Sequence, residues 1–269
     1  MLEDSSEELE NVRKEWDGLS KRYDAYFSTF EGKLDRYLKW RVITECLPEN
    51  RAAKILDAGG GTGIVTLPLA KMGYRVTLCD LSPGQLRLAE AKLRKQGLLE
   101  EVEIKEADIA ALPFPDESFD LVLCVRGPIS LAADSLKAAG ELTRVMKRGG
   151  GICVDVSSRY WAAMQESGKN PEIALKLINF ELNHAHGAHG FGRVFSPKEL
   201  RALFESNGIT VMGIYGDFVY SLPEEMRKAT NWEERLYAQV TDIIVRLSKE
   251  PSITGLGSEL ILVGEKGKV

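Results

Sequence analysis

Four residues between positions 57 and 63 have the types and the spacing of a ligand-binding turn. Asp57, Gly59, Gly61 and Gly63 form the pattern D-x-G-x-G-x-G directly after an apolar, strand-like run that starts at Ile55. Glycine has no Cβ, so such a turn can adopt positive φ and a ligand can lie against its backbone. A strand that ends in this turn and continues into a helix predicts a site for a nucleotide-like cofactor.

A second carboxylate, Asp80, ends the next strand-like run, at 75–80. A carboxylate at this position can accept hydrogen bonds from two neighbouring ribose hydroxyls. An aspartate at a strand end can also be a turn former or a helix cap. Its position one strand after the glycine turn favours the ligand-binding interpretation.

The register of the glycines separates two classes of cofactor. The dinucleotide fingerprint G-x-G-x-x-G, counted from Gly59, requires its third glycine at position 64. The chain has Ile64 there, and its last glycine comes one residue earlier, at Gly63. This is the register of proteins that hold S-adenosylmethionine, and it counts against a nicotinamide-dependent oxidoreductase.

With these motifs, the chain resembles class I S-adenosylmethionine-dependent methyltransferases, of the branch that includes the ubiquinone and menaquinone biosynthesis type. The matching segments span roughly residues 50 to 157 and are 55–63, 80–83, 107–109, 112–122 and 142–150. The resemblance implies S-adenosylmethionine as the cofactor and methyl transfer to a small-molecule acceptor by in-line displacement. It implies cofactor contacts by Asp57, Ala58, Gly59, Gly61, Asp80, Leu81, Asp108, Ile109, Cys124, Val125 and Arg126.

Within this set, the resemblance implies a role for each part of the site. Asp57 and the backbone of the glycine turn face the methionine end. Asp80 takes the ribose hydroxyls, with Leu81 against the adenine. Asp108 accepts from the adenine amino group, while the backbone of Ile109 reads the edge of the ring. Asp108 could also be an ordinary loop residue.

The segment after the predicted strand at 119–125 departs from the family. Members of this branch often carry a histidine there, whereas this chain reads V-R-G-P-I-S from Val125. Residues 124–126 are expected to line the methyl-bearing centre, and the catalytic residue stays unassigned. The N/D-P-P-Y/F motif of base amino-group methylation is missing, and Leu123 stands where carbon-5 cytosine enzymes have proline. These features favour a small-molecule acceptor over nucleic acid, while a protein acceptor stays open.

All three histidines of the chain, His184, His186 and His189, fall within one glycine-rich stretch. Neutral imidazoles bind zinc or iron, but Ala188 stands where the metallo-β-lactamase motif needs aspartate, so no metal is predicted. The stretch could also be a solvated or packing loop. A third interpretation is a glycine-hinged flap over the acceptor. In it, His186 or His189 serves as general base, and Arg126 or Arg193 pairs with an anionic acceptor.

Alternating strands and helices must position these residues. The predicted strands are 54–58, 75–80, 101–105, 119–125, 151–156, 209–215 and 259–264, and the predicted helices between them are 63–72, 83–96 and 134–147. This alternation predicts an α/β, Rossmann-like three-layer sandwich, with a mostly parallel seven-stranded sheet whose last strand is antiparallel. Further helices are expected from Ser196 onward and near 223–248.

The rest of the chain is expected to complete a single domain, 1–269. Residues 1–50 form a helical cap of two helices broken near Glu31-Gly32, whose aromatic stripe is either a packing face or a lid. Residues 51–157 bind the cofactor, 158–196 form an insertion that fits no strand, and 197–269 complete the sheet.

Bulk properties restrict partners and location. The net charge of −5 provides no global basic field for nucleic acid. The N-terminus lacks a secretory signal, no run reaches the roughly 18 apolar residues of a membrane span, and the four cysteines include no C-x-x-C pair. A cytoplasmic protein fits best, and its oligomeric state is open. The principal alternative function is a non-catalytic S-adenosylmethionine-binding protein or partner subunit.

Overall fold

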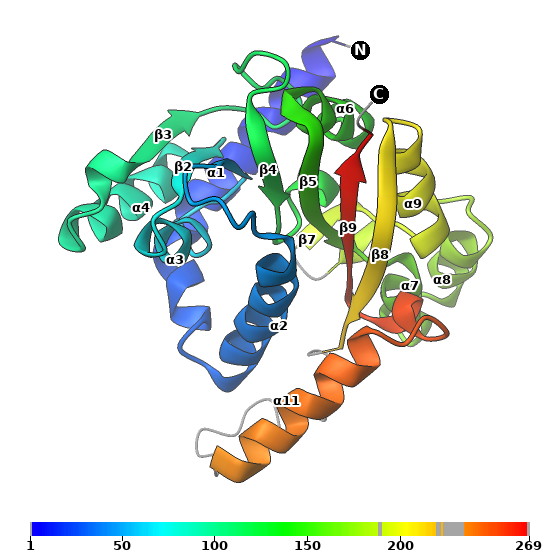
Figure 1. Cartoon of the computed structure of the whole chain (residues 1–269). Helices are drawn as coiled ribbons and strands as arrows, with labels where there is room; N and C mark the ends of the chain where they lie inside the picture. Colours follow the sequence, from blue (N-terminus) through cyan, green and yellow to red (C-terminus); the bar gives the residue numbers. More distant parts are fainter. Residues whose placement is uncertain (1, 188–189, 219–221, 223–233, 268–269) are drawn as a thin grey trace.

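A seven-stranded sheet forms the centre of the molecule (Figure 1). The computed structural model describes residues 2–187, 190–218, 222 and 234–267. The strands are β1 (Lys54–Ala58), β2 (Arg75–Asp80), β3 (Val102–Glu106), β4 (Phe119–Cys124), β5 (Met146–Ser157), β8 (Ile209–Asp217) and β9 (Glu259–Lys266). Their order is β3-β2-β1-β4-β5-β9-β8, and β9 runs antiparallel to both of its neighbours. The predicted α/β sandwich with an antiparallel last strand is confirmed.

Helices cover both faces of this sheet, which explains why nearly all residues of the central strands β1 and β4 are buried. Successive residues of a strand point to opposite faces. Ile55 packs on the side of α2 (Phe30–Cys46), α3 (Thr66–Lys71) and α4 (Pro83–Lys95), whereas its neighbour Leu56 packs toward α5 (Pro128–Leu131), α6 (Ser135–Val145) and α9 (Pro197–Glu205). Three further elements are η1 (Leu99–Glu101), α11 (Glu234–Ser248) and η3 (Thr254–Leu256).

The two helix starts that open with serine and proline are as expected. The Ser82 hydroxyl accepts from the backbone N–H of Gln85 at the start of α4. Ser196 and Glu199 form a reciprocal capping box at the start of α9. In the C-terminal region, the helix expected near 223–248 is present over 234–248, and 223–233 lie outside the described residues.

The two N-terminal helices are α1 (Leu2–Tyr26) and α2, and the break between them lies at 27–29, not at 31–32 as predicted. The Thr29 hydroxyl caps α2 by accepting from the Gly32 N–H at 3.0 Å. Gly32 therefore lies inside α2. A Cβ there would come 2.1 Å from the Tyr26 carbonyl oxygen, so this glycine permits a close approach between the helices.

The expectation that 158–196 fits no strand is wrong. This insertion comprises α7 (Arg159–Ser167), α8 (Pro171–Ile178) and a hairpin of β6 (His184–Gly187) and β7 (Gly190–Arg193). The frequent glycines interrupt the alternation of side chains by which a strand is recognised in a sequence. In the structure, these glycines allow close packing. A Cβ at Gly187 would meet the Ser157 hydroxyl at 2.2 Å, and one at Gly192 would meet the Ser130 carbonyl at 2.3 Å. These two glycines seat the hairpin against β5 and α5, which argues against a hinge at either of them.

Three of the four cysteines lie inside strands of the sheet. Cys79, Cys124 and Cys153 are buried, and burial raises the pKa of the Cys79 and Cys124 thiols. None of the described helices is long and apolar enough to cross a membrane.

Candidate active site

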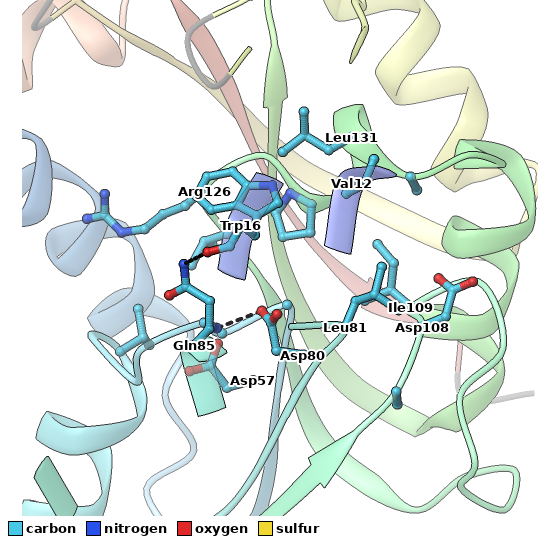
Figure 2. A pocket seen from close by; sticks show the side chains of 18 of the residues that line it. Val12, Trp16, Asp57, Asp80, Leu81, Gln85, Asp108, Ile109, Arg126 and Leu131 are labelled. Carbon is cyan, nitrogen blue, oxygen red and sulfur yellow. Dashed lines mark hydrogen bonds between the residues drawn. The ribbon is translucent and has the colours of Figure 1, made fainter. Parts of the chain in front are cut away.

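A cavity opens at the carboxyl ends of β1, β2 and β4, and its empty space is ≈ 830 Å³ when its mouth is included (Figure 2). Most of the predicted cofactor residues line it, namely Asp57, Gly59, Gly61, Asp80, Leu81, Asp108, Ile109, Val125 and Arg126. Ala58 and Cys124 do not, because they lie within the buried interior of their strands. Its mainly apolar lining with a few carboxylates is typical of a small-molecule site.

Asp57 is fully buried at the base of this cavity. Its Oδ2 accepts from the Thr66 hydroxyl at 2.6 Å, while its Oδ1 has no hydrogen-bond partner among the described residues. Burial, together with the nearby Asp80 charge, raises the pKa of Asp57 to about 6. A cationic donor on a ligand would satisfy this oxygen and favour its charged form.

The glycine turn keeps the floor of the cavity open. Gly59 has φ 69° and Gly61 has φ 53°, the left-handed region that favours glycine. A Cβ at Gly59 would lie 2.5 Å from the Pro128 side chain. The turn therefore requires glycine for its backbone conformation and for the space that it leaves.

Asp80 fastens this turn to the start of α4. One oxygen accepts from the Gly61 N–H at 2.9 Å and the other from the Ser82 N–H at 2.8 Å. Burial outweighs these bonds and raises the pKa of Asp80 to about 6. Each carboxylate oxygen has further acceptor capacity, so a ligand hydroxyl could still bind.

Leu81, Ile109 and Asp108 lie together at one side of the cavity, and Leu131 lies above them (Figure 2). Asp108 Oδ1 accepts from the Ala110 N–H at 2.9 Å, which is a local turn bond. The apolar surfaces beside one carboxylate suit a flat ring with an amino group.

Arg126 extends away from that side, toward α2 (Figure 2). Its backbone has φ 78°, a strained value for a residue with a side chain. Its Nη1 donates to Asp35 Oδ2 at 2.6 Å, and its guanidinium lies 4.4 Å from the centre of the Phe27 ring. Arg126 lines the cavity, but its charge is directed to Asp35 rather than to an acceptor.

Asp35 belongs to a buried charge cluster that the sequence did not reveal. The Lys39 ammonium lies 2.6 Å from Asp35 Oδ1, 3.6 Å from Asp155 and 3.5 Å from Asp217, and it also contacts Glu259. Although burial opposes ionisation, Arg126 and Lys39 hold the pKa of Asp35 well below its usual range. The residues of this charge cluster come from α2, β5, β8 and β9. Because these elements are far apart along the chain, no sequence pattern indicates that they meet.

Helix α1 forms one wall of the cavity through Val12 and Trp16. Asp17 Oδ1 accepts from the Ser82 hydroxyl at 2.5 Å and from the Gly84 N–H at 2.7 Å. Gln85 donates to the Trp16 carbonyl at 3.2 Å, and it also lines the cavity. The sequence prediction omitted Gln85, although its position one turn after Ser82 was available as a signal.

His184 and His186 do not line this cavity. His186 is exposed on the hairpin, with its ring 5.4 Å from the Phe191 ring, and His189 lies outside the described residues. Within the described part of the chain, the cluster with metal-ligand geometry is Asp35, Asp217 and Glu259. The Lys39 ammonium contacts all three carboxylates.

Part of the chain is similar in sequence to a known protein family. Residues 55–150 match the family described as methyltransferase domain. Over 119 residues the chain is 34% identical to the ubiquinone/menaquinone biosynthesis C-methyltransferase UbiE of Pectobacterium carotovorum, covering 43% of this chain and 47% of that protein. The chain thus spans about half the length of this curated relative.

Solved structures agree in fold. A SAM-dependent methyltransferase from Thermotoga maritima has TM-score 0.59 at 20% identity, covering 95% of this chain and 99% of the other. The [4+2]-cyclase SpnF has TM-score 0.55 at 18% identity, covering 86% and 80%. The fold thus occurs with more than one reaction. Residues 55–150 of this chain thus match the methyltransferase-domain family, and the chain shares the fold of a SAM-dependent methyltransferase.

Proposed function

We propose that the chain transfers a methyl group from S-adenosylmethionine to a small-molecule acceptor. The observation that carries this proposal is Asp57, a fully buried carboxylate that lines the cavity with one oxygen lacking a described partner. An unsatisfied buried anion is costly, and the ammonium of a methionine moiety would supply the donor.

The remaining predicted contacts fit other parts of the same cofactor. Asp80 would accept from the ribose hydroxyls, and Leu81 and Ile109 would enclose the adenine beside Asp108. The backbone of the glycine turn would lie under the methionine moiety. Val125 and Arg126 follow β4 and would form the wall near the transferred methyl group.

When bound, S-adenosylmethionine supplies a methyl group on a positively charged sulfur. A lone pair of the acceptor forms the new bond to the methyl carbon, and the electron pair of the broken carbon–sulfur bond stays on sulfur. The protein must align the two molecules and exclude water. A base is needed only for an acceptor that loses a proton, and we assign none.

In this proposal the chain is a single methyltransferase domain. Residues 1–50 cap the cofactor, 51–157 bind it, 158–196 are an insertion and 197–269 complete the sheet. Helix α1 excludes water through Val12 and Trp16, which line the cofactor cavity.

Calorimetry of the purified chain with S-adenosylmethionine and with NAD tests the cofactor. We expect binding of the first alone, and Asp57→Asn is expected to weaken it at least tenfold, since a charged hydrogen bond is lost. Asp242→Asn, an exposed carboxylate paired with Arg246, is the matched control. Binding of NAD without S-adenosylmethionine would overturn the proposal.

An acceptor screen that detects S-adenosylhomocysteine tests the reaction. Product formation with a small molecule is the expected result. Cofactor binding without product for any acceptor would instead identify a non-catalytic binding protein or partner subunit.

A further inference from the structure

A second cavity lies between α2 and the segment that leads into α3, with an empty space of ≈ 1380 Å³ including its mouth. It shares the wall formed by Ile64, Val65 and Arg126 with the cofactor cavity. A molecule in the second cavity would therefore lie next to the wall where β4 ends.

Basic side chains gather around this second cavity. Lys33 and Arg36 of α2 and Lys71 of α3 line it, and all three are exposed. They form no ion pair with any described residue, unlike Lys92, which also lines the cavity and lies 2.8 Å from Asp24. No described carboxylate lines the cavity. In a chain with a net charge of −5, this is a local concentration of positive charge.

Aromatic and aliphatic side chains form the rest of the lining. Trp40 and Ile43 of α2 face Leu67 and Pro68 of the α3 segment across the cavity, and Tyr237 of α11 lies at its border. Such surfaces favour an apolar or aromatic body, because its transfer from water is favourable.

We propose that the second cavity binds the methyl acceptor, and that this acceptor carries an anionic group, a carboxylate or a phosphate, on an apolar or aromatic body. The inference rests on the proposed methyltransferase function. Lys33, Arg36 and Lys71 hold the anionic group at the mouth. Trp40 packs on the body, which places the accepting atom against the wall shared with the cofactor cavity.

Three matched probes test this assignment by calorimetry, namely 2-naphthoate, 2-naphthyl phosphate and the neutral 2-naphthamide. At least one charged probe is expected to bind roughly tenfold or more tightly than the amide, by the strength of charge-assisted hydrogen bonds. The preferred charged probe distinguishes a carboxylate from a phosphate. Equal affinities for all three, or no binding of either anion, would overturn the proposal.

Two sets of variants locate the binding. Lys33→Gln with Lys71→Gln is expected to weaken the charged probe roughly tenfold and leave the amide unchanged. Trp40→Leu is expected to weaken all probes alike, and Lys198→Gln, an exposed lysine of α9, is expected to change none. An unchanged affinity of the charged probe in the double lysine variant would contradict the site.

The cofactor serves as an independent readout on the same proteins. If S-adenosylmethionine binds to the double lysine variant as to the original chain while no anion binds to either, only the acceptor assignment fails. If the original chain does not bind S-adenosylmethionine, the proposed function fails.

Discussion

The Arg126 guanidinium, just after β4, donates a hydrogen bond of 2.6 Å to the Asp35 carboxylate of α2, and both side chains are buried. This contact joins the N-terminal helices to the wall of the cofactor cavity. It gives a buried positive charge its partner, and it accompanies the strained backbone of Arg126.

Asp35→Ala is expected to lower the free energy of unfolding by about 3–5 kcal/mol, because it removes the buried carboxylate that pairs with both Arg126 and Lys39. Urea denaturation measures the change. Asp242→Ala removes an exposed ion pair with Arg246 and is expected to cost at most about 1 kcal/mol. Equal effects of the two substitutions would show that the buried pair contributes no more than a surface pair.

Cofactor affinity is expected to fall as the pH is lowered through about 6, where the carboxylates of Asp57 and Asp80 become protonated and lose their charge. Burial raises both pKa values, and a cationic ligand favours the charged form, so binding is strongest above this pH. Calorimetry between about pH 5 and pH 8 measures the dependence. Asp57→Asn is expected to flatten it, and an unchanged slope would exclude Asp57 as its source.

The same two carboxylates act in the opposite direction on the protein without cofactor. Their pKa values of about 6 in the folded chain lie above the ordinary 3.8. Their contribution to stability is therefore fully present below about pH 3.8 and is lost as the pH rises through 6. We expect Asp80→Asn to shift stability relative to the original chain in favour of the variant between about pH 5 and pH 7, because only the original carboxylate becomes charged over this range. Thermal unfolding of both proteins at the two pH values measures this shift, and the loss of the bonds to Gly61 and Ser82 affects both values alike.

Gly59→Ala is expected to abolish cofactor binding, since the new Cβ would lie 2.5 Å from Pro128 at φ 69°. Gly73→Ala is the matched control, because Gly73 also has positive φ, 85°, yet nothing lies within 4 Å of its Cβ position. Both variants are expected to lose about 1–2 kcal/mol of stability from backbone strain. Retained binding in Gly59→Ala would show that the turn does not support the ligand.

Asp17→Ala is expected to loosen α1, because Asp17 accepts from Ser82 and Gly84 beside the cavity. We expect faster hydrogen exchange in α1 and a cofactor affinity lower by roughly fivefold, the effect of one typical hydrogen bond. Glu15→Ala, an exposed residue of the same helix, is the control. If affinity stayed constant while exchange increased, α1 would not act as a wall for the ligand.

His186→Ala is expected to leave methyl transfer unchanged, because His186 is exposed and lies outside the cavity. Turnover with the acceptor found by the screen, measured as S-adenosylhomocysteine, checks this. A loss of kcat with unchanged cofactor affinity would restore the general-base hypothesis.

Local sequence determined the strands of the sheet and the position of the cofactor residues at their ends. Each predicted strand of the sheet is present, and the central strands β1 and β4 are recognisable because their apolar runs are buried on both faces. The glycine turn, Asp80 and Asp108 come at the carboxyl ends of successive strands. These ends meet at one edge of the sheet. Their convergence on one cavity was therefore predictable from spacing.

Only the tertiary structure decided which other side chains reach the cavity and which buried charges pair. Lys39 meets carboxylates from α2, β5, β8 and β9, and Trp16 reaches the cavity because α1 packs on α4, where Asp17 accepts from Ser82 and Gly84. Arg126 was predicted at the cavity, but its side chain turns to Asp35. Such contacts join residues far apart along the chain, where periodicity and spacing carry no information about pairing. They depend on how the helices pack on the sheet.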